Sequence, residues 1–268
     1  MTRFLRAICL LGLAVGCASL PPIELSEKDP QGALGGTGSL PDTETCVYSC
    51  SWNGIPAGRA TFTGRTVDGT YETVGDIETT GLASAVYGLA LRFEGESREA
   101  DLSSLRWRLA QEGEKSVDIR FDPDAGAAHS EVRVGEEERT FAVSGGKFRE
   151  PLGALYALRR SDLRPGQSFR TTIFAEESAY SAVVLVASRV SVRVPAGEFD
   201  TFLVRADLTR LENGEPVGKP QPQGVWITAD ERRLPVKVDM TSDIGRFVMS
   251  LRSHEVGAPV DGGWDGVQ

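Results

Sequence analysis

The sequence predicts a mainly β protein: one antiparallel, strongly curved sheet or half-open barrel of about a dozen strands, with one or two short helices. Apolar and polar residues alternate with a period of two through most of the chain. Turn signals such as Asp68-Gly69, Gly145-Gly146 and Asn213-Gly214 separate the alternating runs. Because a long open sheet leaves unpaired edges, so many strands joined by tight turns favour a sheet that curls on itself.

The first element, residues 1–16, has the layout of a secretory signal. Arg3 and Arg6 precede an apolar run over residues 7–15. That run has about ten apolar residues, whereas a membrane-spanning helix needs roughly twenty. We therefore expect a cleaved signal rather than a lasting transmembrane anchor.

The signal ends in Leu13-Ala14-Val15-Gly16-Cys17, which resembles the bacterial lipobox, although Ala14 stands where Leu is usual. This resemblance predicts cleavage before Cys17, lipidation of its thiol and a membrane partner held through the acyl chains. Ala18 follows, and the familiar retention signal for the inner membrane is Asp at that place, so the periplasmic face of the outer membrane is favoured. The alternative is an ordinary signal cut nearby, with Cys17 incidental.

Residues 17–45 form the second element, a lipidated terminus followed by a flexible linker. Prolines at 21, 22, 30 and 41 alternate with glycines at 32, 35, 36 and 38, and apolar periodicity is absent. Such a linker would span roughly 30 Å. At the other end, residues 257–268 are rich in glycine and are predicted to be a disordered tail.

Residues 46–256 are predicted to be a single β-rich domain. Tyr48, Cys50 and Trp52 share one face of its first strand, before a turn over residues 54–58, and Ala60 and Phe62 begin the next strand. The later alternating runs are 69–78, 90–98, 105–112, 116–122, 128–134, 137–143, 167–175, 180–194, 199–211, 224–229, 234–241 and 244–254.

Two segments have helical character. Residues 80–91 have the small and apolar residues of a short helix, and residues 150–161 have apolar side chains at helical spacing. Pro151 suits the first turn of the second helix, which should end before Arg164-Pro165-Gly166.

Ile55-Pro56-Ala57-Gly58 and Val194-Pro195-Ala196-Gly197 each place Pro second and Gly fourth, which suits a type I turn. Their structural role would be to set strand entry and register. The functional alternative is that they form the rim of a pocket.

The order and spacing of several motifs resemble the bacterial family called domain of unknown function 3108, over residues 46–255. The motifs are Tyr48-x-x-x-Trp52-x-Gly54-Ile55-Pro56-Ala57-Gly58, Pro151-Leu152-Gly153-Ala154-Leu155-Tyr156-Ala157-Leu158-Arg159, Leu163-x-Pro165-Gly166, Val194-Pro195-Ala196-Gly197-Glu198-Phe199, Val225-Trp226-Ile227-Thr228-Ala229-Asp230 and Leu234-Pro235-Val236-Lys237. The resemblance implies an exported envelope protein. Its strand order is also similar to curved half-barrels that carry lipids or lipoproteins, an analogy of fold alone.

Three aromatic residues are candidates for lining a ligand cavity in a curled sheet: Trp52, Tyr156 and Trp226. The alternative is that they fill the core. Cys46 and Cys50 could form a disulfide in an exported protein, but a straight strand would separate their α-carbons by about 13 Å, so a turn would be needed. Otherwise Cys50 packs as a small apolar residue.

The sequence offers no recognisable catalytic motif. His129 and His254 are not in a His-Glu-x-x-His arrangement, and no Gly-x-Ser-x-Gly or phosphate-binding glycine loop occurs. We therefore expect no enzyme, metal site or cofactor. Loss of Arg3 and Arg6 changes the net charge from −9 to −11, which argues against a nucleic-acid partner.

Two functions remain open at this stage. In the first, the curved sheet encloses a cavity and binds a lipid or other amphiphile. In the second, the domain is a non-catalytic interaction or structural module of an envelope assembly.

Overall fold

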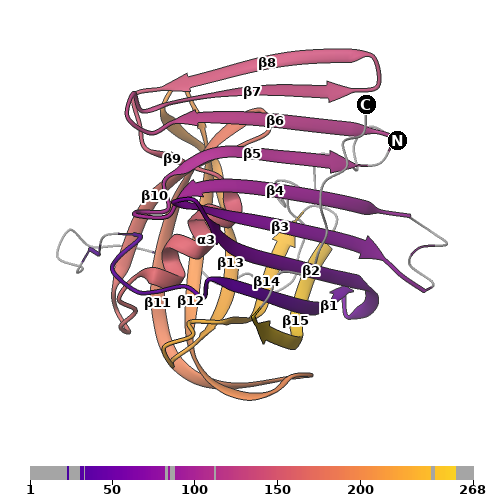
Figure 1. Cartoon of the computed structure of the whole chain (residues 1–268), viewed down its shortest axis with the longest axis vertical. Coiled ribbons are helices and arrows are strands. Elements are labelled where there is room, and N and C mark those ends of the chain that lie inside the picture. Colours follow the sequence, from indigo (N-terminus) through magenta and orange to yellow (C-terminus); the bar gives the residue numbers. More distant parts are fainter. Residues whose placement is uncertain are drawn as a thin grey trace.

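The computed structural model describes residues 23, 31–32, 34–81, 84, 88–111, 113–242 and 245–257 (Figure 1). The predicted signal peptide, Cys17 and the predicted tail beyond Gly257 lie outside these residues. The elements are β1 (Thr43–Trp52), β2 (Ile55–Val67), β3 (Thr70–Thr79), β4 (Ala90–Arg98), β5 (Ser104–Gln111), β6 (Lys115–Asp122), β7 (Ala127–Val134), β8 (Glu137–Ser144), β9 (Phe148–Arg149), α3 (Pro151–Arg160), β10 (Ser168–Ala175), β11 (Ser178–Val194), β12 (Gly197–Glu212), β13 (Glu215–Thr228), β14 (Pro235–Ser242) and β15 (Gly245–Val256).

All strands belong to one 15-stranded sheet in the order β8-β7-β6-β5-β4-β3-β2-β1-β15-β14-β13-β12-β11-β10-β9. Neighbours are antiparallel, except that β9 runs parallel to β10. The first and last strands, β1 and β15, pair at the centre, so each half of the chain builds one half of the sheet. The ends β8 and β9 are not paired with each other. The predicted mainly β, half-open architecture is therefore confirmed, with a few more strands than the dozen expected.

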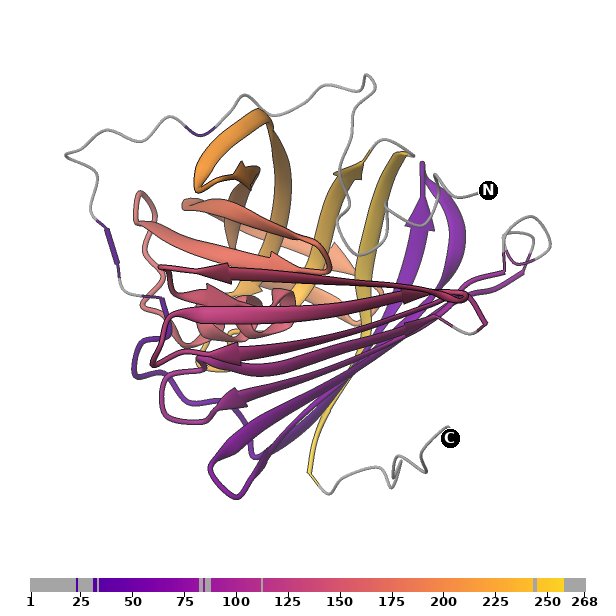
Figure 2. The ribbon, with the colours of Figure 1, turned by 90° about the horizontal axis from the view of Figure 1, so that it is seen from above.

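The sheet curves until its two halves face each other, with α3 between them (Figure 2). Near the open seam the halves are in direct contact, because Phe121 of β6 and Phe174 of β10 pack edge to face with ring centroids 6.4 Å apart. A buried ion pair between Lys115 and Glu176 also joins the two halves. The apolar faces of the two halves thus share one core cluster, in which Phe174 and Ala179 pack against residues of β4–β7.

Helix α3 packs on the concave face of the sheet. Tyr156 contacts Tyr71 of β3, with ring centroids 5.0 Å apart, while Leu158 packs with Phe169 and Ile227 of the other half. Pro151 opens the first turn, as the sequence predicts, and Glu150 before it is the N-cap. One helix therefore contacts both halves of the sheet.

The chain before β1 differs from the predicted linker. In the described part of that segment, the Gly35 and Gly38 amides donate to the Ala157 and Arg160 carbonyls, at the C-terminal end of α3, over 3.1 Å each. An added Cβ at Gly38 would lie 2.8 Å from the Arg160 oxygen, so glycine permits the close approach. Part of the predicted linker is therefore a docked strap, defined here as the described residues between 31 and 42.

Other local expectations also needed correction. The β1–β2 turn is Asn53-Gly54, with φ of 48° and 81°, and the motif at residues 55–58 lies within β2 instead of forming the turn. Much of the predicted helix over residues 80–91 lies outside the described residues, and its last two positions belong to β4. Residues 195–196, by contrast, do connect β11 and β12 as expected.

Candidate functional site

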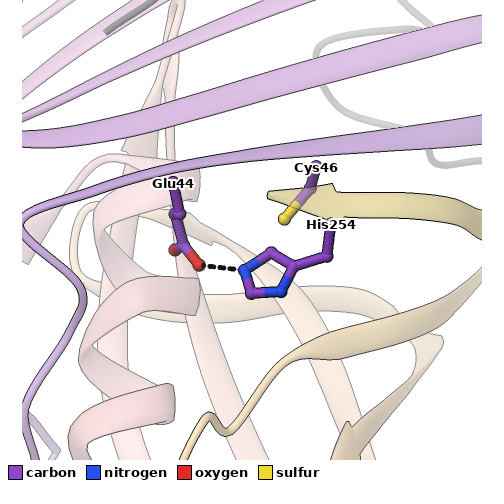
Figure 3. A group of neighbouring side chains, drawn as sticks. All are labelled: Glu44, Cys46 and His254. Carbon is purple, nitrogen blue, oxygen red and sulfur yellow. Dashed lines mark hydrogen bonds and ion pairs between the residues drawn. The ribbon is translucent and has the colours of Figure 1, made fainter. Parts of the chain in front are cut away.

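A buried charged cluster lies where α3 meets the two central strands. Glu44 of β1 is fully buried, and Arg159 of α3 is nearly so, with 2% exposure. Arg159 donates to both carboxylate oxygens, through Nη1 to Oε1 and through Nη2 to Oε2 over 3.0 Å. His254 of β15 completes the cluster through Nε2, which lies 3.0 Å from Glu44 Oε2 (Figure 3).

Glu44 is held in its ionised form by these partners. Burial alone would raise the pKa of the carboxyl group, but the hydrogen bonds from His254 and Arg159 and the Arg159 charge lower it to about 2. Tyr71 adds a weaker hydrogen bond to Oε1 over 3.4 Å. The cluster is therefore a permanent buried ion pair at neutral pH.

Arg159 fixes the position of α3 against other parts of the chain as well. Its Nε donates to the Arg233 carbonyl over 2.9 Å, and its guanidinium lies 4.9 Å from the Tyr156 ring centre. The loop between β13 and β14 is held in this way against the C-terminal half of α3. A fork of five donors suits this role better than a lysine would.

The other end of α3 is fixed by a second buried carboxyl group. Glu150 accepts hydrogen bonds from the amides of Leu152, over 2.6 Å, and Gly153. Burial raises the pKa of Glu150 to about 7, although those backbone hydrogen bonds and Arg149 act in the opposite direction. An added Cβ at Gly153 would lie 3.0 Å from Ser104 Oγ, so this glycine lets α3 approach β5 closely.

Cys46 lies beside the charged cluster, and its thiol is not an activated nucleophile. Burial raises its pKa to about 12, and its exposure is 3%. Cys46 and the predicted disulfide partner Cys50 are both free. They lie on the same extended strand, β1, which has no turn between them. Both pack in the same apolar cluster, in agreement with the alternative interpretation of Cys50.

The three aromatic residues predicted as candidate ligand-lining groups do not meet in the structure. Trp52 stacks on Phe247 at the β1–β2 end, with ring centroids 6.4 Å apart. The Lys237 ammonium lies over Trp226, 4.4 Å from the centre of the indole ring. Tyr156 is buried against Tyr71, close to the charged cluster.

Two hollows among the described residues lie away from α3, which lines neither of them. One of about 330 Å³ lies over β4–β7 and is lined largely by charged side chains such as Arg92, Glu94 and Arg108. The other, of about 450 Å³, lies at the ends of β6–β8 beside His129 and Phe121. The space between α3 and the concave face is instead occupied by packed side chains.

Sequence reasoning missed Glu44, Arg159 and His254 as a group. A usable signal was present, because Glu44 alternates with Cys46 and Tyr48 on an otherwise apolar face, and a charged residue on such a face needs a partner. Arg159 gives a similar signal, because it stands beside the apolar Leu158 on the buried face of the helix.

Most of the chain matches a known protein family. Residues 47–252 match the family described as protein of unknown function, DUF3108. No curated protein matches the chain. Among the described residues, no helix is both long and apolar enough to cross a membrane.

A solved structure shares the architecture at low sequence identity. A β-barrel-like protein of the DUF1849 family from Brucella abortus aligns with a TM-score of 0.54 and 12% identity, over 82% of this chain and 100% of that one. A protein from Bacteroides fragilis, described as exported and of YmcC-like fold, aligns with a TM-score of 0.38 and 9% identity, over 83% and 99% of the two chains. At 12% identity the likeness to the Brucella abortus protein concerns the fold alone.

Proposed function

The chain belongs to the DUF3108 family, and from that premise we propose that it is a lipid-anchored, non-catalytic interaction module of the cell envelope. The observation that carries the choice is the position of α3. The helix occupies the concave face that a lipid carrier would need to keep open.

Both ends of α3 oppose its removal. Withdrawing the helix would separate Arg159 from Glu44 and expose the backbone amides that Glu150 caps. Breaking a buried ion pair by loss of one partner costs about 3–5 kcal/mol. A carrier in which α3 moves aside for each amphiphile would incur that cost in every cycle, so we favour the interaction module.

The free edge of the sheet offers such a module a place to bind a partner. In the described residues no strand pairs with the outer side of β8, whereas the β10 edge is partly covered by β9 and by a bridge from Gln31 to Ser168. One end of β8 carries three charged residues, Glu137, Glu138 and Arg139, whereas residues 140–144 are uncharged. An extended segment of a partner protein could add there as a further strand.

The strap changes the expected geometry of the anchor. The chain contacts β10 at Gln31, and the Ile23 amide donates to Asp207 Oδ2 over 2.5 Å. Ile23 stands six residues after Cys17, and six residues reach at most about 20 Å when fully extended, less than the 30 Å expected for the whole linker. We therefore propose a domain held near the membrane surface.

Lipid attachment is tested by labelling cells with a fatty-acid analogue. We expect label on the wild-type protein and none on a Cys17→Ser variant. Equal labelling of both proteins would contradict lipidation at this residue.

The partner surface is tested by placing a photo-crosslinking amino acid at Ala142 of β8. Arg252, exposed on the central strand β15, is the matched control. We expect one dominant protein adduct from position 142 and none from 252. Equal adducts from both sites would argue against the edge, and stoichiometric lipid co-purifying in native mass spectra would favour the carrier instead.

A further inference from the structure

Three side chains with different metal-binding atoms meet beside α3. The carboxylate of Glu44, the thiol of Cys46 and the imidazole of His254 place one ligand atom each within 4.8 Å of the others (Figure 3). The sequence alone predicts no such site, because its ligands come from opposite ends of the domain.

Strand geometry explains why the three side chains converge. Glu44 and Cys46 are two residues apart on β1, so both point to the concave face. His254 is the direct partner of Cys46 across the β1–β15 pair. This triangle of positions is fixed by the backbone of two central strands rather than by a loop, which favours a preorganised site.

The distances suit a small ion. Zinc lies about 2.0–2.3 Å from nitrogen, oxygen and sulfur ligands, which in a tetrahedral arrangement places two ligands roughly 3.3–3.8 Å apart. The distance from His254 Nε2 to Glu44 Oε2 is 3.0 Å, and the three ligand atoms all lie within 4.8 Å of one another. Side-chain shifts of less than about 1 Å would bring the ligands to bonding distance.

The charge of the cluster permits a divalent ion. The charges of Glu44 and Arg159 cancel, and a histidine binds zinc as the neutral imidazole. Binding of Zn²⁺ with loss of the thiol proton leaves a net charge of about +1, below the +2 of a three-histidine zinc site. Arg159 can retain its hydrogen bond to Oε1, while the ion would lie between Glu44 Oε2 and His254 Nε2, which are 3.0 Å apart.

We propose that Glu44, Cys46 and His254 form a binding site for zinc, with a fourth position open to water. The mixed oxygen, sulfur and nitrogen donors fit Zn²⁺ and exclude hard ions such as Mg²⁺ and Ca²⁺, which take oxygen ligands. The His254 side chain is 10% exposed, so solvent reaches the cluster on that side. Three protein ligands and an open position are the arrangement of an accessible zinc site rather than a closed structural one.

Binding releases a proton. The zinc–sulfur bond forms as the Cys46 S–H bond breaks, and the proton goes to solvent. The charged and titratable groups that face the thiol are Glu44 and Tyr48 of β1, Tyr71 of β3, Tyr156 and Arg159 of α3, and His254 of β15.

The test titrates the mature acylated protein, in detergent and freed of metal by a chelator, with Zn²⁺ in competition with a chromophoric chelator. The ligand variants are Cys46→Ala and His254→Gln. Their matched controls are Cys50→Ala, another free thiol on β1, and His129→Gln, the other histidine. Circular dichroism of each variant verifies that it is folded.

We expect one zinc per chain and an affinity loss of at least about 100-fold in both ligand variants but not in the controls. Replacing Zn²⁺ by Cd²⁺ should give a thiolate charge-transfer band in the ultraviolet that Cys46→Ala abolishes and Cys50→Ala retains. The inference is overturned if the wild type binds no zinc, if the controls lose as much affinity as the ligand variants, or if the cadmium band survives loss of Cys46.

Discussion

Substitution of Arg159 by Met is expected to destabilise the domain strongly. Met retains an unbranched stem that can pack on Tyr156 but removes the charge that faces Glu44. A carboxylate left buried without its cation costs about 3–5 kcal/mol. The lowering of the Glu44 pKa from 4.5 to about 2 comes from His254 and Arg159 together, so the corresponding ~3 kcal/mol, at ~1.36 kcal/mol per pH unit, is the joint contribution of both partners.

The assay is urea unfolding at pH 7 in the presence of a chelator, with the free energy of unfolding obtained by linear extrapolation. Arg189→Met is the matched control, because its ion pair with Asp200 is exposed, with 58% and 54% side-chain exposure. Exposed pairs contribute little to stability, because solvent screens both charges. A double variant, Glu44→Leu with Arg159→Met, removes both charges and should recover most of the loss.

The pH dependence gives an independent measure of the same pair. Since the folded-state pKa of Glu44 is lowered, its contribution is fully present above about pH 4.5 and is lost as the pH falls toward 2. The wild type should show this loss, and Arg159→Met should show much less of it. A loss below 1 kcal/mol at pH 7, or a double variant no more stable than the single one, would refute the reasoning.

Three further outcomes follow from the same region. Because the pKa of Glu150 is raised to about 7, its contribution to the free energy of unfolding is greatest below about pH 4.5 and declines as the pH rises to 7. The Glu150→Gln variant should therefore show a smaller decline of the free energy of unfolding over this pH range. An unchanged decline would assign it to another group. Gly153→Ala should lower the urea midpoint although alanine favours helices, because its Cβ would lie 2.7 Å from Glu150 Oε1; a raised midpoint would show that α3 can shift. A thiol reagent should label neither Cys46 nor Cys50 rapidly in the folded, acylated protein and both after unfolding, and rapid labelling of Cys46 in the folded state would contradict its burial.

Strand positions were predictable where one face of a strand is apolar. The run predicted at residues 180–194 corresponds to β11, Ser178–Val194. The first half of β13 escaped prediction, since Pro216, Gly218 and Pro220 interrupt the alternation, and most of that stretch is exposed. A strand that buries few side chains leaves no period-two signal, and its pairing with β12 comes from tertiary structure.

The strap shows a different limit of the sequence. Its glycines and prolines have the composition of a flexible linker, yet the same glycines allow the backbone to approach the carbonyls at the end of α3. Those carbonyls lack partners within the helix, so a passing chain with exposed amides satisfies them. The glycine and proline content of the strap indicates how flexible this segment is in the unfolded chain. Its docking in the folded protein depends on the end of α3, which a distant part of the sequence forms.

The charged cluster could be predicted only in part, for a reason that lies in the topology. Arg159 is 115 residues from Glu44, and His254 is 210 residues away. No spacing rule connects such positions, because the first and last strands become neighbours only through the topology of the whole sheet. A sequence can nevertheless show that Glu44 needs a partner, since it stands on the apolar face of a strand. Because Arg159 and His254 meet the two sides of that carboxylate, one residue at the start of the domain joins α3 to both central strands, and the same position supplies the oxygen of the proposed zinc site.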